Sequence, residues 1–143
     1  MITAWFDGAC EPTNPGGVMS YGAYIIKYGK TIWSESKIVE TPGQSTNNIA
    51  EYSGFIAILE YLLSNNLQDE PILIHGDSKL VIEQMFGTWQ IKSGAYKPYA
   101  LKSKELLKKF KSANGTWIPR EENEAADELS KCALQAVGIF QRK

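Results

Sequence analysis

Four acidic residues far apart in the chain are the side chains best suited to chemistry: Asp7, Glu51, Asp77 and Asp127. Carboxylate oxygens without a thiolate are the donors that hard cations such as Mg²⁺ and Mn²⁺ prefer. Two such ions about 4 Å apart can clamp the attacking and leaving oxygens of a phosphodiester. If these carboxylates converge, the sequence predicts a two-ion site for phosphoryl transfer, with Mg²⁺ or Mn²⁺ as the cofactor.

The elements that must position these acids follow from hydrophobic periodicity. Strands are predicted over 2–6, 18–28, 31–40, 71–76 and 115–119, and helices over 47–63, 78–86, 96–110 and 122–137. Short turns join the first three strands into an antiparallel meander, and the later alternation of strand and helix indicates parallel pairing. We expect a single α/β domain over 1–143. Its mixed five-stranded sheet has three antiparallel then two parallel strands, with helices on both faces.

The predicted elements place the acids at one edge of the sheet. Asp7 and Asp77 directly follow the first and fourth strands, and ligand sites of α/β sheets gather beyond strand ends. If these strands are parallel neighbours, the two carboxylates lie side by side, and their repulsion favours a cation between them. Glu51 lies in the first turn of one helix and Asp127 early in the last helix, so both can point at the same edge.

Each acid taken singly also has an ordinary structural interpretation. Asp77 could cap the following helix, and Glu51 could complete a capping box with the residue three positions earlier. Asp7 could belong to a turn, and Asp127 could be one solvated acid among several on its helix. Only the joint placement of the four residues favours the metal site.

Composition bounds the class of protein. The chain has 143 residues, 43% of them hydrophobic and 22% charged, which is typical of a soluble domain. No apolar run approaches the roughly 20 residues of a membrane span, and the N-terminus does not resemble a signal peptide. We therefore expect a cytoplasmic protein without a membrane partner, and a monomer. Cys10 and Cys132 are expected to be free thiols and lack zinc-site spacing.

Charge is separated along the chain although the net charge is only −1. Residues 92–111 contain seven lysines and one acid, whereas residues 112–130 contain five acids and one arginine. This distribution predicts a basic face for phosphates and an acidic pocket for cations.

Five segments carry a resemblance to a known family: Phe6–Cys10 (FDGAC), Asn14–Gly17 (NPGG), Ser45–Tyr52 (STNNIAEY), Gly76–Ser78 (GDS) and Trp117–Asp127 (WIPREENEAAD). In order and approximate spacing, the chain resembles type 1 ribonuclease H, and more closely its compact archaeal-like branch. The resemblance covers nearly the whole chain. It implies a ribonuclease H-like three-layer fold. It also implies hydrolysis of the RNA strand of RNA–DNA hybrids with two divalent cations, giving 5′-phosphate and 3′-hydroxyl products.

The resemblance also implies roles for the acids. Asp7 would be shared between both metal ions, Glu51 and Asp77 would complete one metal site, and Asp127 would hold the other ion. In the family the attacking water is activated on a metal, so no protein nucleophile is required.

Six residues match positions that contact the hybrid in the family: Gly8, Asn14, Thr46, Asn47, Asn48 and Ser78. Gly8 and Ser78 would lie near the RNA 2′-hydroxyls, and Thr46 would line a pocket for a DNA-strand phosphate. The three asparagines would contact the hybrid, where side-chain amides can contact base edges in the wide minor groove. Asn14 could instead be a turn residue, and Asn48 a helix cap.

Two departures from the family pattern concern substrate handling. Bacterial and eukaryotic relatives carry a His in a glycine-rich loop before the last helix, where this chain has Pro119–Arg120–Glu121–Glu122. Arg120 is the candidate to replace the function of that loop. The only histidine, His75, lies two residues before Asp77 and would share its strand face. We expect it to be a packed side chain or one that supports a metal ligand, not a ligand itself.

The second departure is the absence of an inserted basic helix, since only residues 87–95 separate the two helices there. Lys92 and Lys97 could partly replace it or simply be solvated. Trp89 and Tyr96 could flank a phosphate track, but we expect them to cover the core.

Two other functions stay open at this point: a DNA-directed nuclease on the same fold, and a hybrid-binding module without catalysis. The asparagine cluster and short length oppose the first. The presence of all four carboxylates opposes the second.

Overall fold

The structure is a computed structural model that describes residues 1–139. Its elements are β1 (Ile2–Glu11), β2 (Val18–Lys27), β3 (Lys30–Val39), α1 (Asn47–Ser64), β4 (Ile72–Gly76), α2 (Lys79–Phe86), α3 (Lys97–Leu107), β5 (Ala113–Trp117), a 3₁₀ turn (Arg120–Glu122) and α4 (Glu124–Ala136). The order of strands and long helices is the one predicted from periodicity.

The strands form one sheet in the order β3-β2-β1-β4-β5. β1 pairs antiparallel with β2, and β2 with β3, while β4 is parallel to both β1 and β5. Tyr28 and Gly29 both have positive φ at the turn between β2 and β3, as a tight hairpin turn requires. The predicted mixed sheet of three antiparallel and two parallel strands is confirmed.

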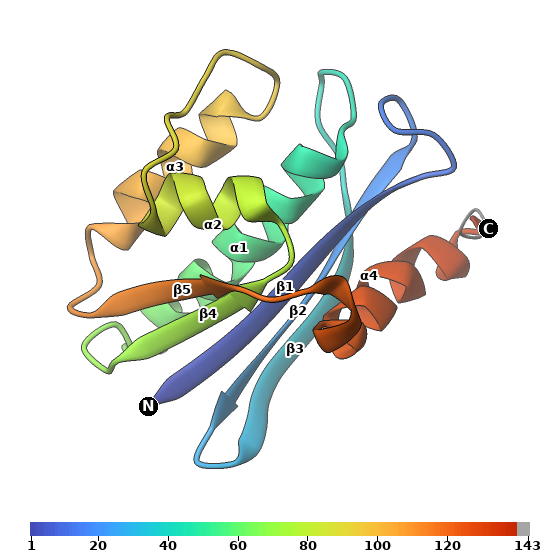
Figure 1. The fold of residues 1–143 in the computed structure, drawn as a ribbon. Helices are drawn as coiled ribbons and strands as arrows, with labels where there is room; N and C mark the ends of the chain where they lie inside the picture. Colours follow the sequence, from blue (N-terminus) through green and yellow to red (C-terminus); the bar gives the residue numbers. More distant parts are fainter. Residues whose placement is uncertain (140–143) are drawn as a thin grey trace.

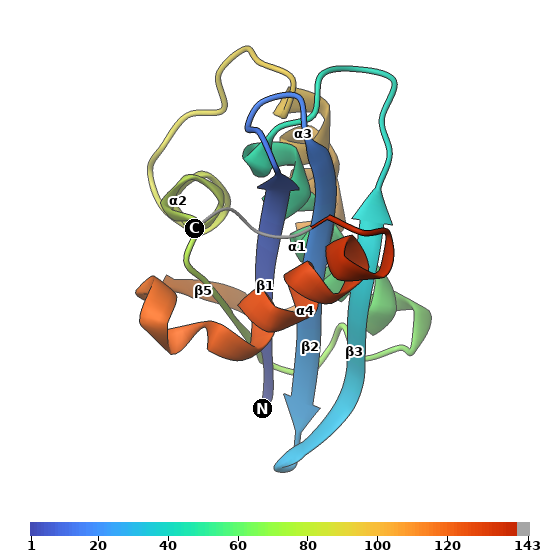
Figure 2. The same cartoon turned by 90° about the vertical axis from the view of Figure 1, so that its right-hand side faces the viewer.

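The sheet is the middle of three layers (Figure 1). α1 packs on one face against β1 and β2, α2 lies beside it over β4 and β5, and α3 packs against these two helices. α4 crosses β1, β2 and β3 on the opposite face. Figure 2, turned by 90°, shows α4 in front of the strands and α1 behind them. The predicted helices on both faces are therefore confirmed.

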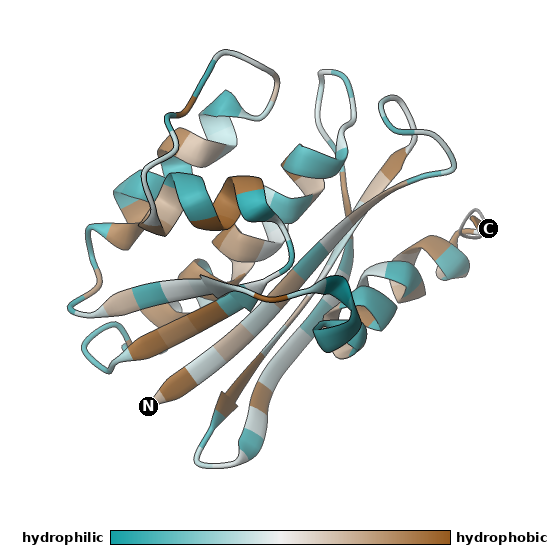
Figure 3. Cartoon of the chain, viewed as in Figure 1, coloured by the Kyte–Doolittle hydropathy of each residue, from teal (hydrophilic) through white to brown (hydrophobic). Residues whose placement is uncertain are grey.

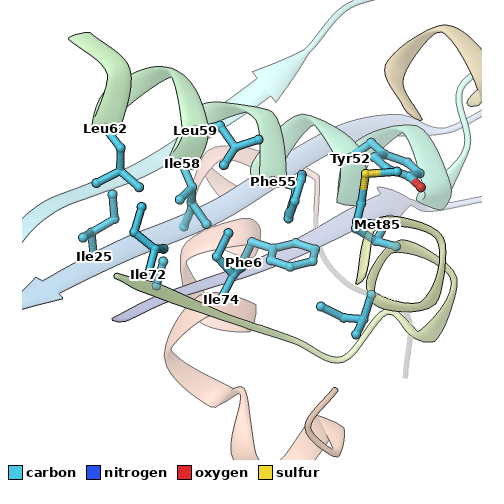
Figure 4. Packing of buried hydrophobic residues seen from close by; sticks show 14 of the residues in the cluster. Phe6, Ile25, Tyr52, Phe55, Ile58, Leu59, Leu62, Ile72, Ile74 and Met85 are labelled. Carbon is cyan, nitrogen blue, oxygen red and sulfur yellow. The ribbon is translucent and has the colours of Figure 1, made fainter. Parts of the chain in front are cut away.

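The main core lies between α1 and the sheet (Figure 4). Ile2, Ala4 and Phe6 alternate inward along β1 and are fully buried, as the two-residue period of a strand requires. Phe6 meets Phe55 of α1 edge to face, with ring centroids 5.6 Å apart. Most of β4 is hydrophobic in Figure 3, as is typical of a parallel strand with neighbours on both sides.

Three strands match their predicted limits to within one residue, and the other two, β1 and β5, differ by more. β1 does not end at Phe6 but runs on to Glu11, because β2 continues to pair with it as far as Glu11↔Val18 after β4 has left. β5 ends at Trp117, two residues before the predicted limit, because its last pairing partner on β4 is Gly76.

Two further findings concern the described residues. Cys10 is buried and Cys132 is exposed, and no disulfide joins them. None of the helices within residues 1–139 has the length and hydropathy of a membrane span.

Candidate active site

The parallel pairing of β1 and β4 brings the first two acids together. Phe6↔Gly76 is the last pair between these strands, so Asp7 and Asp77 occupy the next position on each. The predicted placement side by side is confirmed. Asp7 nevertheless lies within a strand, still paired with Gly22 of β2, so the turn at Asp7 considered above is excluded.

Glu51 reaches the same place because α1 packs directly on β1. A Cβ added at Gly8 would lie 2.4 Å from the backbone nitrogen of Glu51 and 2.6 Å from the carbonyl carbon of Ala50. Only a residue without a side chain lets the first turn of α1 come this close. Thr46 fixes that turn, because its hydroxyl accepts a hydrogen bond from the Ile49 N–H at 3.2 Å.

Asp127 is delivered from the other face by α4. A Cβ at Gly22 would lie 2.4 Å from both Ala126 O and Ser130 N, so this glycine allows α4 to lie against β2. The hydroxyls of Ser20 and Ser36 donate to backbone carbonyls of α4, at Ser130 and Leu129. α1 thus approaches one face of the sheet at Gly8, and α4 approaches the other face at Gly22, the pairing partner of Asp7.

The acids form a compact cluster. One ligand oxygen from each of Asp7, Glu51 and Asp77 lies within 4.8 Å of the others. Asp127 falls outside this group of three but lines the same cleft, whose volume is about 440 Å³. Asp7 and Glu51 are buried, with 5% and 3% of their surface exposed.

Burial and mutual repulsion make the carboxylates hard to ionise. Burial, followed by the charges of Asp77 and Asp127, raises the pKa of Asp7 to about 8. Burial and then the charge of Asp7 raise the pKa of Glu51 well above its usual value. Burial also raises the pKa of Asp77, although an Asn123 hydrogen bond and the Arg120 charge oppose this. A cation bound among these three carboxylates would lower their pKa values, because it would favour their charged forms.

The donor set fits a divalent cation. Oε2 of Glu51 is buried without a hydrogen-bond partner among the described residues, and such an atom is costly unless something else binds it. The oxygens are the hard donors that Mg²⁺ and Mn²⁺ favour. Asp7, Glu51 and Asp77 could hold one ion, and Asp127 with Asp7 a second.

The helix-capping interpretations of these acids are wrong. α1 is capped by Thr46, not by a residue that would pair with Glu51 in a capping box. α2 is capped by Ser78, whose hydroxyl accepts from the Val81 N–H at 3.3 Å, so Asp77 is not the cap. Both carboxylates are therefore left to face the cleft.

The predicted substrate residues divide into two groups. Gly8, Asn14, Asn47 and Arg120 line the cleft with the acids, whereas Thr46, Asn48 and Ser78 do not. Oδ1 of Asn14 accepts from the Asn47 N–H at 3.0 Å, which ties the loop before β2 to the start of α1. Thr46 and Ser78 are the helix caps described above, and Asn48 is exposed. Contact of any of the seven with a substrate stays a prediction.

Two residues that contact Asp77 were given no role from the sequence. Asn123 is 1% exposed; its Nδ2 donates to Phe6 O at 2.9 Å and lies 3.5 Å from Asp77 Oδ2. Trp117 lines the cleft, and its Nε1 donates to Asp77 O at 3.1 Å. For Asn123, the one feature of the sequence that could have drawn attention to it is its position immediately before the last helix.

His75 is a packed residue, as expected. Its ring stacks on Trp5, with centroids 4.9 Å apart and planes 10° from parallel. Burial lowers the pKa of His75, which favours the neutral ring. It does not line the acidic cleft.

The expectation for Trp89 and Tyr96 is half right. Tyr96 packs on Tyr52 with ring centroids 6.0 Å apart, and its hydroxyl accepts from the Lys92 N–H at 3.1 Å. Trp89 is 46% exposed, so the prediction that it covers the core is wrong. The segment before α3 is held through Tyr96 instead, which leaves Trp89 at the surface.

Comparison with known proteins gives the same assignment along most of the chain. A family model described as reverse transcriptase-like matches residues 6–133. A bifunctional protein of Mycobacterium tuberculosis is 36% identical over 124 residues, which cover 86% of this chain and 33% of that protein. The chain thus spans about a third of the length of its mycobacterial relatives.

Solved ribonuclease H structures are similar to this chain in both fold and sequence. RNase H1 from the halophilic archaeon Halobacterium salinarum has a TM-score of 0.82 and 33% identity, covering 94% of this chain and 98% of that one. LC11-RNase H1, solved in complex with an RNA/DNA hybrid, has a TM-score of 0.84 and 30% identity, covering 96% and 99%. With the acidic cluster at the same sheet edge that the sequence motifs indicate, the chain belongs to the type 1 ribonuclease H family.

Proposed function

We propose that this protein is a metal-dependent endoribonuclease that hydrolyses the RNA strand of RNA–DNA hybrids, giving 5′-phosphate and 3′-hydroxyl products. The observation that carries the proposal is the convergence of Asp7, Glu51 and Asp77, with oxygens within 4.8 Å, in a cleft that Asp127 also lines. These side chains come from β1, from the residue that follows β4, and from the helices α1 and α4, so their convergence is a property of the whole fold.

The proposed cofactor is a pair of Mg²⁺ or Mn²⁺ ions. Such ions would supply an activated water and neutralise charge on the phosphate when bound. The protein's part is to hold the ligands. Asp7 is fixed within the β1–β2 ladder, Glu51 by the close packing of α1 at Gly8, and Asp77 by the donors Asn123 and Trp117. Little reorganisation of these three acids is then required.

Support for the hybrid as substrate comes from the shape and donors of the cleft together with the relatives. LC11-RNase H1 binds an RNA/DNA hybrid and shares this fold. Asn14, Asn47 and Arg120 line the cleft around the acids, where they offer amide and guanidinium donors to the backbone or base edges of a duplex. Contacts to 2′-hydroxyls would distinguish RNA from DNA.

The test is a comparison of substrates under one condition. The protein is incubated with Mg²⁺ or Mn²⁺ and labelled RNA–DNA hybrid, RNA duplex, DNA duplex or single strands. We expect cleavage of RNA within the hybrid, loss of cleavage with EDTA, and loss of cleavage with retained binding in Asp7→Asn. Cleavage of DNA would indicate a DNA-directed nuclease, and binding without cleavage would indicate a hybrid-binding module; either result contradicts the proposal.

We further propose that the protein works as a monomer in the cytoplasm. Sedimentation of the purified protein tests the first point, and localisation of a tagged chain in its native cell tests the second.

A further inference from the structure

Among residues 1–139, Asp127 is the one acid of the four that forms an ion pair with a lysine. Nζ of Lys131, one helical turn further along α4, lies 2.7 Å from Oδ2 of Asp127. Their side chains are only 25% and 20% exposed. By contrast, the ion pair of Lys108 with Glu105 on α3 is 71% and 72% exposed. The Asp127–Lys131 pair is therefore partly shielded from solvent, which strengthens its electrostatic interaction.

The same carboxylate faces the acidic cluster. Asp127 lines the cleft with Asp7, Glu51 and Asp77, and its negative charge helps to raise the pKa of Asp7. It is also the one predicted ligand outside the group of oxygens that lie within 4.8 Å of one another. Asp127, which is paired with the Lys131 ammonium, is thus also the acid that a second metal ion would require as a ligand.

An ammonium and a divalent cation compete for such a carboxylate. Lysine is a compact point charge on a flexible stem, and the partial exposure of Lys131 lets the stem swing towards solvent. A cation that binds Asp127 must displace the ammonium or accept its repulsion at close range. Either event lowers the affinity of the site for that cation.

We propose that Lys131 is a resident counter-cation of the active site: it holds Asp127 in the metal-free protein and sets the metal concentration at which the second ion binds. This inference rests on the proposed function, because it assumes that the cluster binds divalent cations. Lys131 is a positioning residue in this account, since it acts only through Asp127.

The test measures Mn²⁺ binding by titration calorimetry in the absence of nucleic acid. Lys131→Met keeps the length of the side chain and removes the charge, and we expect its weaker binding step to tighten about three- to fivefold, the effect of a partly exposed ion pair. Lys131→Arg should bind as the wild type does. Lys108→Met, which removes the exposed pair on α3, is the matched control and should change nothing.

A second arm asks whether the effect passes through Asp127. In an Asp127→Asn background, Lys131→Met should no longer alter Mn²⁺ binding. Equal or weaker binding by Lys131→Met in the otherwise wild-type protein overturns the inference and leaves the proposed function standing. A wild-type protein that binds no Mn²⁺ overturns both, so the two failures are distinguishable.

Discussion

Replacement of Asp7 by Asn removes a buried carboxylate that the metal-free fold holds at a cost. The unfolded chain loses the Asp7 proton near the ordinary pKa of about 3.9, whereas burial and the neighbouring acids raise the folded pKa to about 8. Folding is therefore opposed increasingly as the pH rises between these two values. The amide of Asn has no such charge and can still accept the hydrogen bond from the Gly8 N–H.

The magnitude follows from the difference in pKa. Each unit corresponds to about 1.4 kcal/mol, so the penalty is on the order of 4 kcal/mol at pH 7 and between about 1 and 2 kcal/mol at pH 5. We expect Asp7→Asn to raise the free energy of unfolding by about 2–4 kcal/mol at pH 7 in EDTA, because imperfect packing of the amide offsets part of the gain. The variant should be more stable and inactive.

The assay is urea denaturation of both proteins in EDTA at pH 5 and pH 7. Asp69→Asn, which changes an exposed aspartate, controls for the removal of an acid as such and should leave stability nearly unchanged. An Asp7→Asn protein less stable than the wild type at pH 7 would refute the reasoning. So would a gain that does not shrink at pH 5.

Three further results are expected. Because the pKa values of Asp7 and Glu51 are raised and ligands must be deprotonated, Mg²⁺ affinity should rise with pH through the Asp7 pKa of about 8. Calorimetry in buffers of different ionisation enthalpy should detect proton release, and pH-independent binding would contradict this. Gly8→Ala would place a Cβ 2.4 Å from Glu51 N and should cost about 2 kcal/mol or more of stability and abolish activity, measured by denaturation and hybrid cleavage. Gly43→Ala, whose Cβ would meet only Thr41 Oγ1 at 4.0 Å, should change neither. Asn123→Ala leaves Phe6 O without its donor and should cost about 1–3 kcal/mol by thermal unfolding; unchanged stability would contradict the assigned role.

The pattern of elements was predictable because it depends on local periodicity. The inward-facing positions of α1 and the apolar run of β4 form the core that their periodicity predicts. Parallel strands end at the same edge of a sheet, which correctly predicted that Asp7 and Asp77 lie side by side. Strand limits were less predictable, because they depend on partners. β1 extends to Glu11 only because β2 is available to pair beyond the end of β4.

Long-range contacts supplied what the sequence could not. Gly22 reads as an ordinary strand residue, yet α4 approaches the sheet over it. Asn123 precedes a helix like any capping residue, but its side chain crosses to Phe6 O and lies near Asp77. The pairing of Asp127 with Lys131 has the helical i,i+4 spacing, but its partial burial in the cleft wall depends on how α4 packs.

The most direct test of the account is anomalous diffraction from crystals of the protein soaked in Mn²⁺. We predict anomalous peaks in contact with carboxylate oxygens of Asp7, Glu51 and Asp77, and a further peak at Asp127 at higher Mn²⁺ concentration. Crystals in which Mn²⁺ binds elsewhere, or in which the four carboxylates stay free of metal at saturating concentration, would contradict the claim that these residues form a metal-dependent nuclease site.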